Sequence, residues 1–449
     1  MDPLRSPLLT DLYQLTMLQT YLERGMTDTA VFEFFVRKVP ENRGFLLAAG
    51  LEQALDFLEA LRFSEEELEW IRSCGKFASD FADHLEGMRF DGEVHALPEG
   101  TVCFADTPIL QVIAPLPVAQ LVESRLINLL HFQTLIATKA IRCVLAAPDR
   151  LLVDFGMRRA HGAEAGLLAA RACWLAGFAG SATVLANPLY GVPVFGTMAH
   201  SFILAHESET AAFESFARSH PDNVVLLIDT WDTEAAAHKV VKLAPRLAEA
   251  GIRIKAVRLD SGDLADHARK VRRILDEGGL KDTGIFCSGN LDEYRIAELL
   301  AEQAPIDGFG IGTRLDTSAD APYLDSAYKL MAYAGRPVRK RSEGKATWPG
   351  RKQVWRRLDA DGRWQEDTLG LAEESHAGEP LLVPVMKNGR RIAPSEPMDR
   401  IRARVKEEVA RLPETARRIH APVAPSVTPS EALRELARQL DAEAAAARD

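Results

Sequence analysis

The sequence predicts an α/β protein whose centre is a parallel sheet covered by helices. Between residues 151 and 312, six short apolar runs have the composition of buried strands, and helical segments separate most of them. The six runs are LLVDF (151–155), VPVFG (192–196), VVLLID (224–229), IKAVRLD (254–260), GIFCSG (284–289) and GFGIG (308–312). Continuous apolar strands that alternate with helices are typical of parallel sheets. Because there are at least six such units, a closed or irregular barrel is favoured over an open sheet.

Two helices of this central region follow from their local patterns. A helix is predicted over 263–275, with an apolar stripe formed by Leu264, Ala268, Val271 and Leu275. Asn290 precedes Glu293 by three residues, a spacing that predicts a helix start with Asn290 as the cap. We assign residues 126–330 to an α/β barrel domain.

The N-terminal region predicts helices followed by a compact sheet. Residues 51–61 form one apolar helical face, made by Leu51, Ala54, Leu55, Leu58 and Leu61. Ser64 and Glu67 have the spacing of a capping box. From about 90 to 115 the runs EVHAL, TVCFA and ILQVIAPL are rich in strand-forming residues and are broken by Pro and Gly. Residues 1–125 are therefore expected to form the first part of an open-faced α/β sandwich domain.

The C-terminal region predicts further strands. Asp361-Gly362 within VWRRLDADGRWQE and Asn388-Gly389 within LLVPVMKNGRRI are both typical of hairpin turns. We expect the strands of 331–400 to rejoin the N-terminal sheet, so that the sandwich domain is built from both chain ends. Residues 401–449 are expected to form a helical extension.

Composition narrows the classes of partner. The 449 residues carry a net charge of −10, whereas a nucleic-acid-binding protein normally has a basic excess. The cysteines are odd in number and none has metal-ligand spacing, so we expect neither a disulfide framework nor a metal site made by protein ligands alone. The start of the chain lacks the features of a signal peptide, and no apolar run approaches the roughly 20 residues of a membrane helix. A cytoplasmic protein without membrane association is expected.

Polar or glycine-rich sequence follows each apolar run of the central region. In a β/α barrel these strand ends face one rim, where active sites are built. A single Asp, Ser, Asn or Gly there often serves only as a cap or turn former. Six such ends together, with Arg158, His200 and Arg258 among them, predict a site instead.

Arg258 and Asp260 are two residues apart at the end of an extended run, so both are expected to point to the same side. The arginine could clamp a carboxylate or a phosphate, and the aspartate could hold ribose hydroxyls or Mg²⁺. A surface ion pair of little energetic value is the alternative. His200, near Thr197 on a turn, is able to act as a base, an acid or a nucleophile.

Two glycine turns are candidates for phosphate binding. They are Ser288-Gly289-Asn290 and Gly310-Ile311-Gly312-Thr313. Glycine lets the backbone N–H groups approach an anion closely, and barrel phosphate sites often form after the last strands.

Nine ordered motifs resemble those of nicotinate phosphoribosyltransferases. They are TDLYQLTM, FEFFVRKVPENRGFLLAAGLEQAL, ATKAIR, VDFGMRRAHG, GTMAHSF, IDTWDT, KAVRLDSGDL, IFCSGNLDE and GFGIGTRL. The resemblance runs from about Thr10 to Arg356 and implies a type II phosphoribosyltransferase fold, an irregular α/β barrel beside an open α/β domain. It also implies a homodimer with active sites at the subunit interface.

The activity that this resemblance implies joins nicotinate to 5-phosphoribosyl 1-diphosphate. The products are nicotinate mononucleotide and diphosphate, with Mg²⁺ on the diphosphate. ATP hydrolysis accompanies turnover through a transiently phosphorylated histidine, which corresponds to His200.

The same resemblance implies roles for individual residues. Phe155 and Tyr13 of the other subunit would sandwich the pyridine ring, and Arg158 and Arg258 would meet the substrate carboxylate or phosphates. Asp260 would face the ribose. The residues implied at the 5′-phosphate are Ser288, Gly289, Asn290, Gly310, Gly312 and Thr313, and those implied elsewhere in the substrate site are Thr197 and Lys139.

Several alternatives stay open. Nicotinamide phosphoribosyltransferases share the architecture but carry an acid where this chain has Gly180-Ser181-Ala182-Thr183, and Ser181 can donate to a carboxylate. Quinolinate phosphoribosyltransferases lack the histidine turn and need a larger basic cluster. A non-catalytic metabolite sensor on the same fold is a different class. A barrel isomerase or aldolase would predict a catalytic lysine at a strand end, and none of the central strand ends has one.

Overall fold

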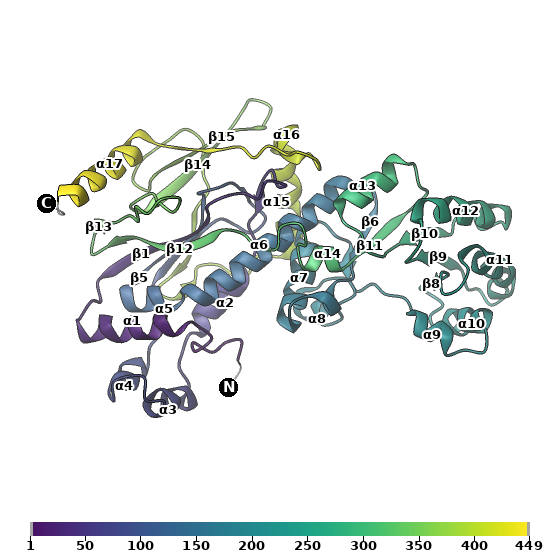
Figure 1. Ribbon diagram of the computed structural model, residues 1–449, viewed down its shortest axis with the longest axis horizontal. Helices are drawn as coiled ribbons and strands as arrows, with labels where there is room; N and C mark the ends of the chain where they lie inside the picture. The colour runs from purple at the N-terminus through teal and green to yellow at the C-terminus, as the bar shows by residue number, and fades with distance from the viewer. Residues whose placement is uncertain (1–2, 447–449) are drawn as a thin grey trace. The chain divides into compact units, whose positions relative to one another are not determined.

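The computed structural model describes residues 3–446 and divides the chain into two compact units (Figure 1). The central unit comprises Lys139–Pro322, and the terminal unit combines Met1–Thr138 with Tyr323–Asp449. The chain passes between them within helix α6 (Glu123–Ala146).

The central unit is built on a parallel six-stranded sheet with the order β7-β6-β11-β10-β9-β8. Its strands are β6 (Leu151–Asp154), β7 (Gly180–Ser181), β8 (Val224–Leu227), β9 (Ile254–Leu259), β10 (Gly284–Cys287) and β11 (Gly308–Ile311). The sheet curls into half of a barrel with β7 and β8 at its edges, so the predicted irregular barrel is confirmed and a closed one is not formed.

One of the six predicted strands is wrong. The run 192–196 forms no strand and makes only an isolated bridge between Val194 and Ser181, while the sixth strand is the short β7. Pro193 has no N–H to give to a sheet ladder, which restricts this segment to an edge position. Its carbonyl oxygen lies so close to Gly180 that a Cβ there would be 2.2 Å away.

Helices accompany the strands of the central unit. They are α7 (Ala163–Ala176), α8 (Ala186–Tyr190), α9 (His200–Leu204), α10 (Glu209–Ser219), α11 (Thr233–Glu249), α12 (Leu264–Glu277), α13 (Glu293–Ala301) and α14 (Thr313–Asp316), with a 3₁₀ turn η1 (Met157–Arg159). The predicted apolar stripe of α12 is buried, which confirms that helix. Figure 1 shows α11 and α12 beside β8 and β9.

The predicted cap of α13 is wrong. Asp292, not Asn290, is the N-cap, and its side chain accepts hydrogen bonds from the backbone N–H groups of Tyr294 and Arg295. Gly289 and Asn290 have φ values of +97° and +52°. Residues in this left-handed conformation cannot be part of a right-handed helix, so they form a turn after β10 and the helix begins later, at Glu293.

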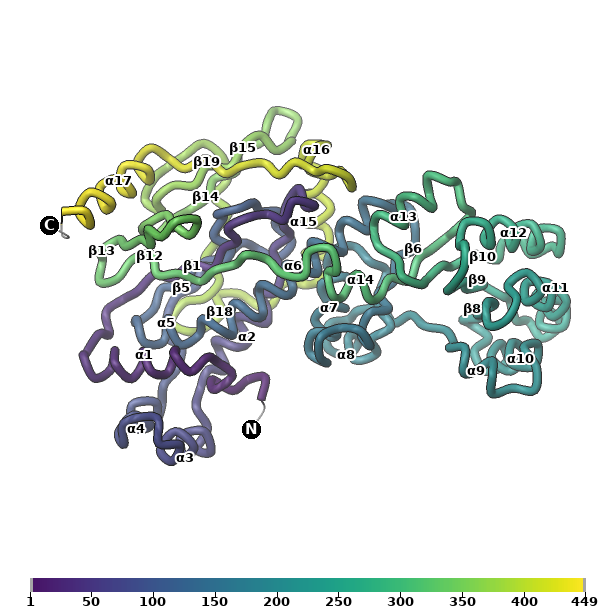
Figure 2. The backbone as a smooth tube through the Cα atoms, viewed as in Figure 1, coloured from purple at the N-terminus to yellow at the C-terminus, as the bar shows by residue number. Residues whose placement is uncertain are grey.

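The terminal unit joins strands from both chain ends in a seven-stranded sheet with the order β13-β12-β1-β5-β3-β17-β18. Its strands are β1 (Thr29–Val36), β3 (Glu93–Ala96), β5 (Pro108–Pro115), β12 (Ser326–Tyr333), β13 (Arg336–Pro337), β17 (Val383–Lys387) and β18 (Arg390–Arg391). β12 pairs with β1 and β17 pairs with β3, so part of the C-terminal region joins the N-terminal sheet, whereas β14, β15 and β16 belong to a different sheet. Figure 2 traces the green β12 beside the purple β1.

A second sheet of this unit has the order β16-β14-β15-β19, and β2 pairs with β4. These strands are β2 (Leu46–Leu47), β4 (Val102–Cys103), β14 (Lys352–Leu358), β15 (Trp364–Leu371), β16 (Glu379–Pro380) and β19 (Val427–Pro429). The hairpins at Asp361-Gly362 and Asn388-Gly389 are confirmed. The last segment, expected to be helical, also supplies β19, which pairs with β15.

The helices of the terminal unit are α1 (Leu12–Glu23), α2 (Leu51–Ala60), α3 (Glu65–Ser73), α4 (Phe81–Leu85), α5 (Leu116–Leu121), α15 (Met398–Arg411), α16 (Glu414–Arg417) and α17 (Glu431–Ala446). Ser64 and Glu67 form the predicted capping box at the start of α3. Helix α6 has the length and mean hydropathy, 1.3, of a membrane span, which the sequence analysis did not single out. Because 72% of that stretch is buried inside the structure, α6 is better explained as a core helix.

Candidate active site

A hydrogen-bonded cluster joins the carboxyl ends of β9 and β10. The Arg258 guanidinium donates from Nε to Ser288 Oγ at 2.8 Å and from Nη2 to Asp260 Oδ1 at 2.9 Å. Ser288 Oγ in turn donates to Asp260 Oδ1. Arg258 and Asp260 therefore point to the same side, as their spacing predicts, and Ser288 fixes the pair to the neighbouring strand.

Asp260 is held in its ionised form. Burial alone would raise its pKa, but the hydrogen bond from Ser288 and the charge of Arg258 outweigh burial and lower the pKa below the usual range. About a quarter of the side chain is still exposed, so the carboxylate can meet a ligand.

His200 lies beside this cluster as the first residue of α9. Its Nδ1 is 3.2 Å from Thr230 Oγ1 and its Nε2 is 3.9 Å from Asp260 Oδ2. The imidazole is 41% exposed. Thr230 thus orients one ring nitrogen, while the other faces the carboxylate and open space. Arg258 Nη1 also donates to the backbone carbonyl of Met198, which ties the histidine turn to β9.

Two residues of the polar segment after β8 have contacts that the sequence analysis did not assign to them. One is Thr230, the partner of the histidine. The other is Asp229, whose Oδ2 accepts hydrogen bonds from Asp260 N at 2.9 Å and Ser261 Oγ at 2.6 Å. Asp229 Oδ1 is buried and has no hydrogen-bond partner among the described residues. The signal in the sequence was the polar segment directly after an apolar strand, the position where barrel active sites are built.

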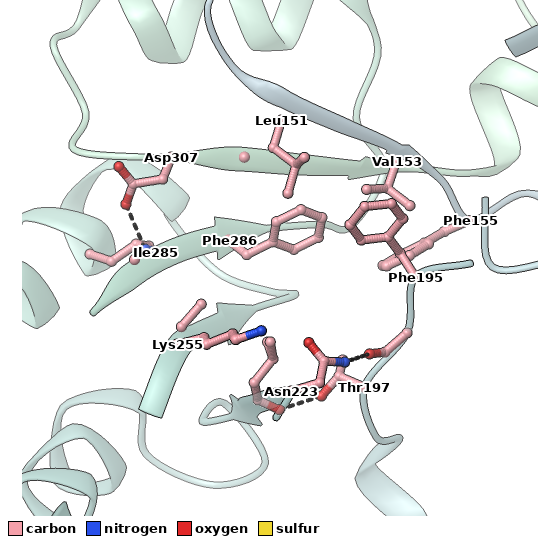
Figure 3. Close-up of a pocket in the computed structure, with 15 residues that line it drawn as sticks. Leu151, Val153, Phe155, Phe195, Thr197, Asn223, Lys255, Ile285, Phe286 and Asp307 are labelled. Atoms are coloured by element: carbon pink, nitrogen blue, oxygen red, sulfur yellow. Dashed lines mark hydrogen bonds between the residues drawn. The ribbon is translucent and has the colours of Figure 1, made fainter. Parts of the chain in front are cut away.

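Phe155 supplies an aromatic surface next to the cluster. Its ring lies 5.5 Å from the Arg258 guanidinium carbon and 5.8 Å from the Phe286 ring. A Cβ on Gly310 would lie 2.6 Å from the Phe155 ring, so that glycine makes room for the ring. The phosphate contact expected of Gly310 stays a prediction. Figure 3 shows Phe155 and Phe286 on one side of a cavity within the sheet.

The turn after β10 borders a separate cavity of about 350 Å³. Gly289, Asn290, Arg295 and Arg314 line it, together with the acids Asp292 and Glu298. Arg314, which the sequence analysis missed, donates to Asn290 Oδ1 and Asp292 Oδ2. A glycine turn with two guanidinium groups can hold a phosphate.

Gly289 is irreplaceable at this turn on steric grounds. Its φ is +97°, and an added Cβ would lie 2.0 Å from the backbone oxygen of Asp260. We expect Gly289→Ala to displace the turn and to lower both the thermal midpoint and the affinity for the phosphate-bearing substrate. Gly279→Ala is the matched control, because Gly279 has φ +78° and open space around it. The control should cost only the ~1–2 kcal/mol of left-handed strain. Equal effects of the two substitutions would contradict the steric argument.

The structure does not bring two of the predicted residues to the open site. Lys139 is 1% exposed, and its ammonium group forms ion pairs with Glu293 and Asp320. Its charge is therefore compensated within the fold and has no open face for diphosphate. Ser181 is fully buried and donates its hydroxyl proton to Asp154 Oδ2 at 2.6 Å, so it cannot also donate to a substrate carboxylate.

Other predicted residues are accessible. Arg158 in η1 is exposed, and Gly312 and Thr313 lie at the end of β11. Thr197 lines the cavity of Figure 3, and its hydroxyl donates to the backbone carbonyl of Val225. Tyr13 lies on α1 of the terminal unit with 49% of its surface exposed.

Family models cover most of the chain. The nicotinate phosphoribosyltransferase (NAPRTase) N-terminal domain matches residues 8–131, the NAPRTase family model matches 151–346, and the C-terminal domain matches 375–437. The chain belongs to the nicotinate phosphoribosyltransferase family. The resemblance seen in the nine motifs is thereby confirmed.

Named relatives agree with this membership. Nicotinate phosphoribosyltransferase pncB2 of Mycobacterium tuberculosis is 50% identical over 407 residues, which are 90% of this chain and 87% of the relative. The human nicotinate phosphoribosyltransferase is 33% identical, with 97% of this chain and 96% of the relative covered.

Solved structures show the same fold. The crystal structure of human nicotinic acid phosphoribosyltransferase matches with a TM-score of 0.87 at 31% identity, covering 96% of this chain and 99% of that chain. A nicotinate-nucleotide pyrophosphorylase from Pyrococcus furiosus matches in fold, with a TM-score of 0.74 at 24% identity over 91% of this chain and 96% of that chain. The predicted type II phosphoribosyltransferase fold is confirmed.

A pair of buried carboxyl groups supports the Phe155 loop in this member of the family. Asp154 accepts hydrogen bonds from Ser181 Oγ and from the backbone N–H of Gly156. The carboxyl group of Asp316 is buried beside Asp154, and the two side chains share a hydrogen bond. Burial and the neighbouring charge of Asp154 raise the pKa of Asp316 well above its ordinary value. We infer that Asp316 is the protonated member of the pair.

Protonation of Asp316 in the folded state predicts that the protein becomes less stable as the pH rises. The unfolded carboxyl ionises near pH 4 while the folded one keeps its proton, so the folded state loses up to ~1.4 kcal/mol per pH unit as the pH rises. Asp316→Asn removes this loss. We expect the thermal midpoint of the variant, relative to that of the wild type, to be higher at pH 7 than at pH 4.5.

The control is Asp266→Asn, because Asp266 is exposed and its hydrogen bond with Lys270 lowers its pKa. This control should show no gain with rising pH. A difference between Asp316→Asn and the wild type that is the same at both pH values would show that Asp316 is ionised in the folded state.

Proposed function

We propose that the chain transfers the phosphoribosyl group of 5-phosphoribosyl 1-diphosphate to nicotinate, giving nicotinate mononucleotide and diphosphate. The observation that carries the proposal is the cluster of Arg258, Asp260 and His200 next to the Phe155 ring. It offers an aromatic surface, cations and a carboxylate within one site. The names of the relatives support the same activity.

The chemistry requires charge stabilisation more than acid–base work. The pyridine nitrogen of nicotinate attacks C1 of the ribose, the bond from C1 to the diphosphate oxygen breaks, and the diphosphate leaves with the electron pair. Positive charge develops on the sugar. The ionised Asp260 is suited to stabilise that charge, while Arg258 and Ser288 hold its carboxylate in place.

Nicotinate is favoured over nicotinamide by the cations of the site. Arg158 is exposed and Arg258 stacks on Phe155, so a carboxylate on the ring meets positive charge. Because Ser181 is occupied by Asp154, discrimination falls to the arginines. Nicotinamide phosphoribosyltransferase activity is the alternative.

The residues of the site fit a magnesium ion brought by the diphosphate. Asp229 keeps one buried oxygen without a hydrogen-bond partner among the described residues, and Asp260 offers a second carboxylate nearby. Carboxylate oxygens together with phosphate oxygens are the ligands that Mg²⁺ prefers. The ion would neutralise charge on the leaving diphosphate.

We further propose that ATP hydrolysis accompanies turnover through phosphorylation of His200. The exposed imidazole supports this role, because Thr230 orients Nδ1 and leaves Nε2 facing the site. The γ-phosphoryl group of ATP would pass to Nε2 with release of ADP, and water would later take the phosphoryl group. The protein is proposed to act in the cytoplasm as a homodimer, with exposed Tyr13 of one subunit completing the ring site of the other.

The test is an assay of purified protein with 5-phosphoribosyl 1-diphosphate, Mg²⁺ and either nicotinate or nicotinamide, with and without ATP. We expect nicotinate mononucleotide, formed faster with ATP. Product from nicotinamide alone would favour the alternative activity. No product from either substrate would favour a metabolite sensor on the same fold.

A further inference from the structure

The curled sheet of the central unit borders a half-open cavity of about 410 Å³. Ligand pockets range from roughly 300 to 1,000 Å³. Its walls are mostly apolar and aromatic, with Phe155, Phe195 and Phe286 lining it (Figure 3). Val153 and Val225 add aliphatic surface from β6 and β8. Such walls suit a flat aromatic ring.

The cavity extends away from the proposed catalytic cluster. Leu151, Gly284 and Gly308 line it, and each is the first residue of its strand, whereas the catalytic residues lie at the strand ends. Lys255 also lines the cavity, five residues before Asp260. At ~3.3 Å per residue, these two side chains start about 16 Å apart. A single pyridine carboxylate cannot reach both.

A bulge lets Lys255, an exposed residue, line this space. Val224 pairs with Ile254 and Val225 pairs with Ala256, so Lys255 is the extra residue of β9 with no partner on β8. Bulges redirect a side chain that the strand alternation would send to the other face. Figure 3 shows the Lys255 ammonium group between Phe286 and Asn223, opposite Phe155.

We propose that this cavity is a second binding site, for a flat aromatic ring that carries one carboxylate. The ring packs between the aromatic walls and the carboxylate pairs with Lys255, with Asn223 beside it. The only acid in the lining, Asp307, accepts a hydrogen bond from the backbone N–H of Ile285 at 2.7 Å. Since Phe155 borders both positions, a molecule in the cavity influences the ring site above it.

The experiment measures benzoate binding by calorimetry. Benzoate has the ring and the carboxylate but lacks the nitrogen that reacts, so no turnover is needed. We expect Lys255→Met to weaken binding on the order of 10-fold or more, and Lys255→Arg to restore it. Lys242→Met is the matched control, an exposed lysine on α11. Uncharged benzamide should bind on the order of 10-fold more weakly than benzoate.

A second variant fills the cavity. An added Cβ at Gly284 meets no atom closer than 3.4 Å. We expect Gly284→Leu to extend its side chain into the cavity and to abolish the Lys255-dependent binding, with the thermal midpoint checking that the variant is folded. Equal benzoate affinity in the wild type, Lys255→Met and Gly284→Leu would overturn the proposal. So would benzamide binding as tight as benzoate binding, or equal losses in Lys255→Met and Lys242→Met.

The choice of ring rests on the proposed function, yet the two proposals fail separately. Protein that forms nicotinate mononucleotide but binds benzoate independently of Lys255 has no second site of this kind. Protein that binds benzoate through Lys255 but forms no mononucleotide has the cavity site without the proposed activity.

Discussion

His200→Asn should abolish the acceleration of mononucleotide formation by ATP. The asparagine keeps a polar group next to Thr230 but cannot carry a phosphoryl group, so the step that couples ATP to turnover is removed. Removing a group that acts directly in catalysis typically costs 10²–10⁴-fold, so we expect the ATP-stimulated rate to fall by about 10²-fold or more. Rates with and without ATP, and incorporation of label from γ-labelled ATP, measure the effect.

The control for this prediction is His238→Ala. His238 is exposed on α11 and should leave both the ATP effect and the labelling unchanged. A weak rate without ATP is expected to survive in His200→Asn, because Asp260 and Arg258 are intact. If ATP still accelerates His200→Asn as it does the wild type, the phosphohistidine role is wrong.

Asp260→Asn should be the most damaging change to the transfer step itself. Asparagine can still accept the hydrogen bonds of Arg258 and Ser288, so the local geometry should persist while the negative charge disappears. Loss of one preorganised electrostatic group in an active site costs about 10²–10³-fold, or ~2.7–4 kcal/mol. We expect kcat/KM for nicotinate to fall by that factor.

The matched control for this loss is Asp266→Asn, which removes an exposed carboxylate on α12. Surface substitutions of this kind usually change stability by no more than ~0.5 kcal/mol. Thermal midpoints should show that Asp260→Asn is folded. Unchanged kcat/KM in a folded Asp260→Asn would remove Asp260 from the mechanism.

The strands of the central unit could be predicted because their apolar runs are continuous. A buried parallel strand needs apolar residues on both faces, and β8, β9, β10 and β11 carry that signal in the sequence itself. The run 192–196 has the same composition but fails as a strand because Pro193 breaks the ladder and Gly180 approaches its carbonyl. Composition does not report such close contacts between distant segments.

The residues of the candidate site also fall into two groups, those that a local pattern predicts and those whose contacts depend on distant segments. Arg258 and Asp260 were predictable because two residues of one strand share a face, and His200 because it follows a glycine turn. The ion pairs of Lys139 could not be predicted, because its partners, Glu293 and Asp320, are far away in the sequence.

The buried carboxyl pair was invisible for a similar reason. Nothing local in the sequence shows that Asp316 packs against Gly156 and Asp154, where an added Cβ on the glycine would lie 2.1 Å from the carboxyl carbon. Contacts between buried polar groups depend on tertiary packing, so the local sequence pattern does not predict them.

The most direct test of the central claim is the stoichiometry of wild-type turnover with nicotinate, 5-phosphoribosyl 1-diphosphate, Mg²⁺ and ATP. Nicotinate mononucleotide, diphosphate and ADP would be quantified in the same samples, and acid-labile phosphate would be mapped on the protein. The account predicts that all three products accumulate together and that the acid-labile phosphate is on His200. Mononucleotide formed without release of ADP, or acid-labile phosphate on another residue, would contradict the account.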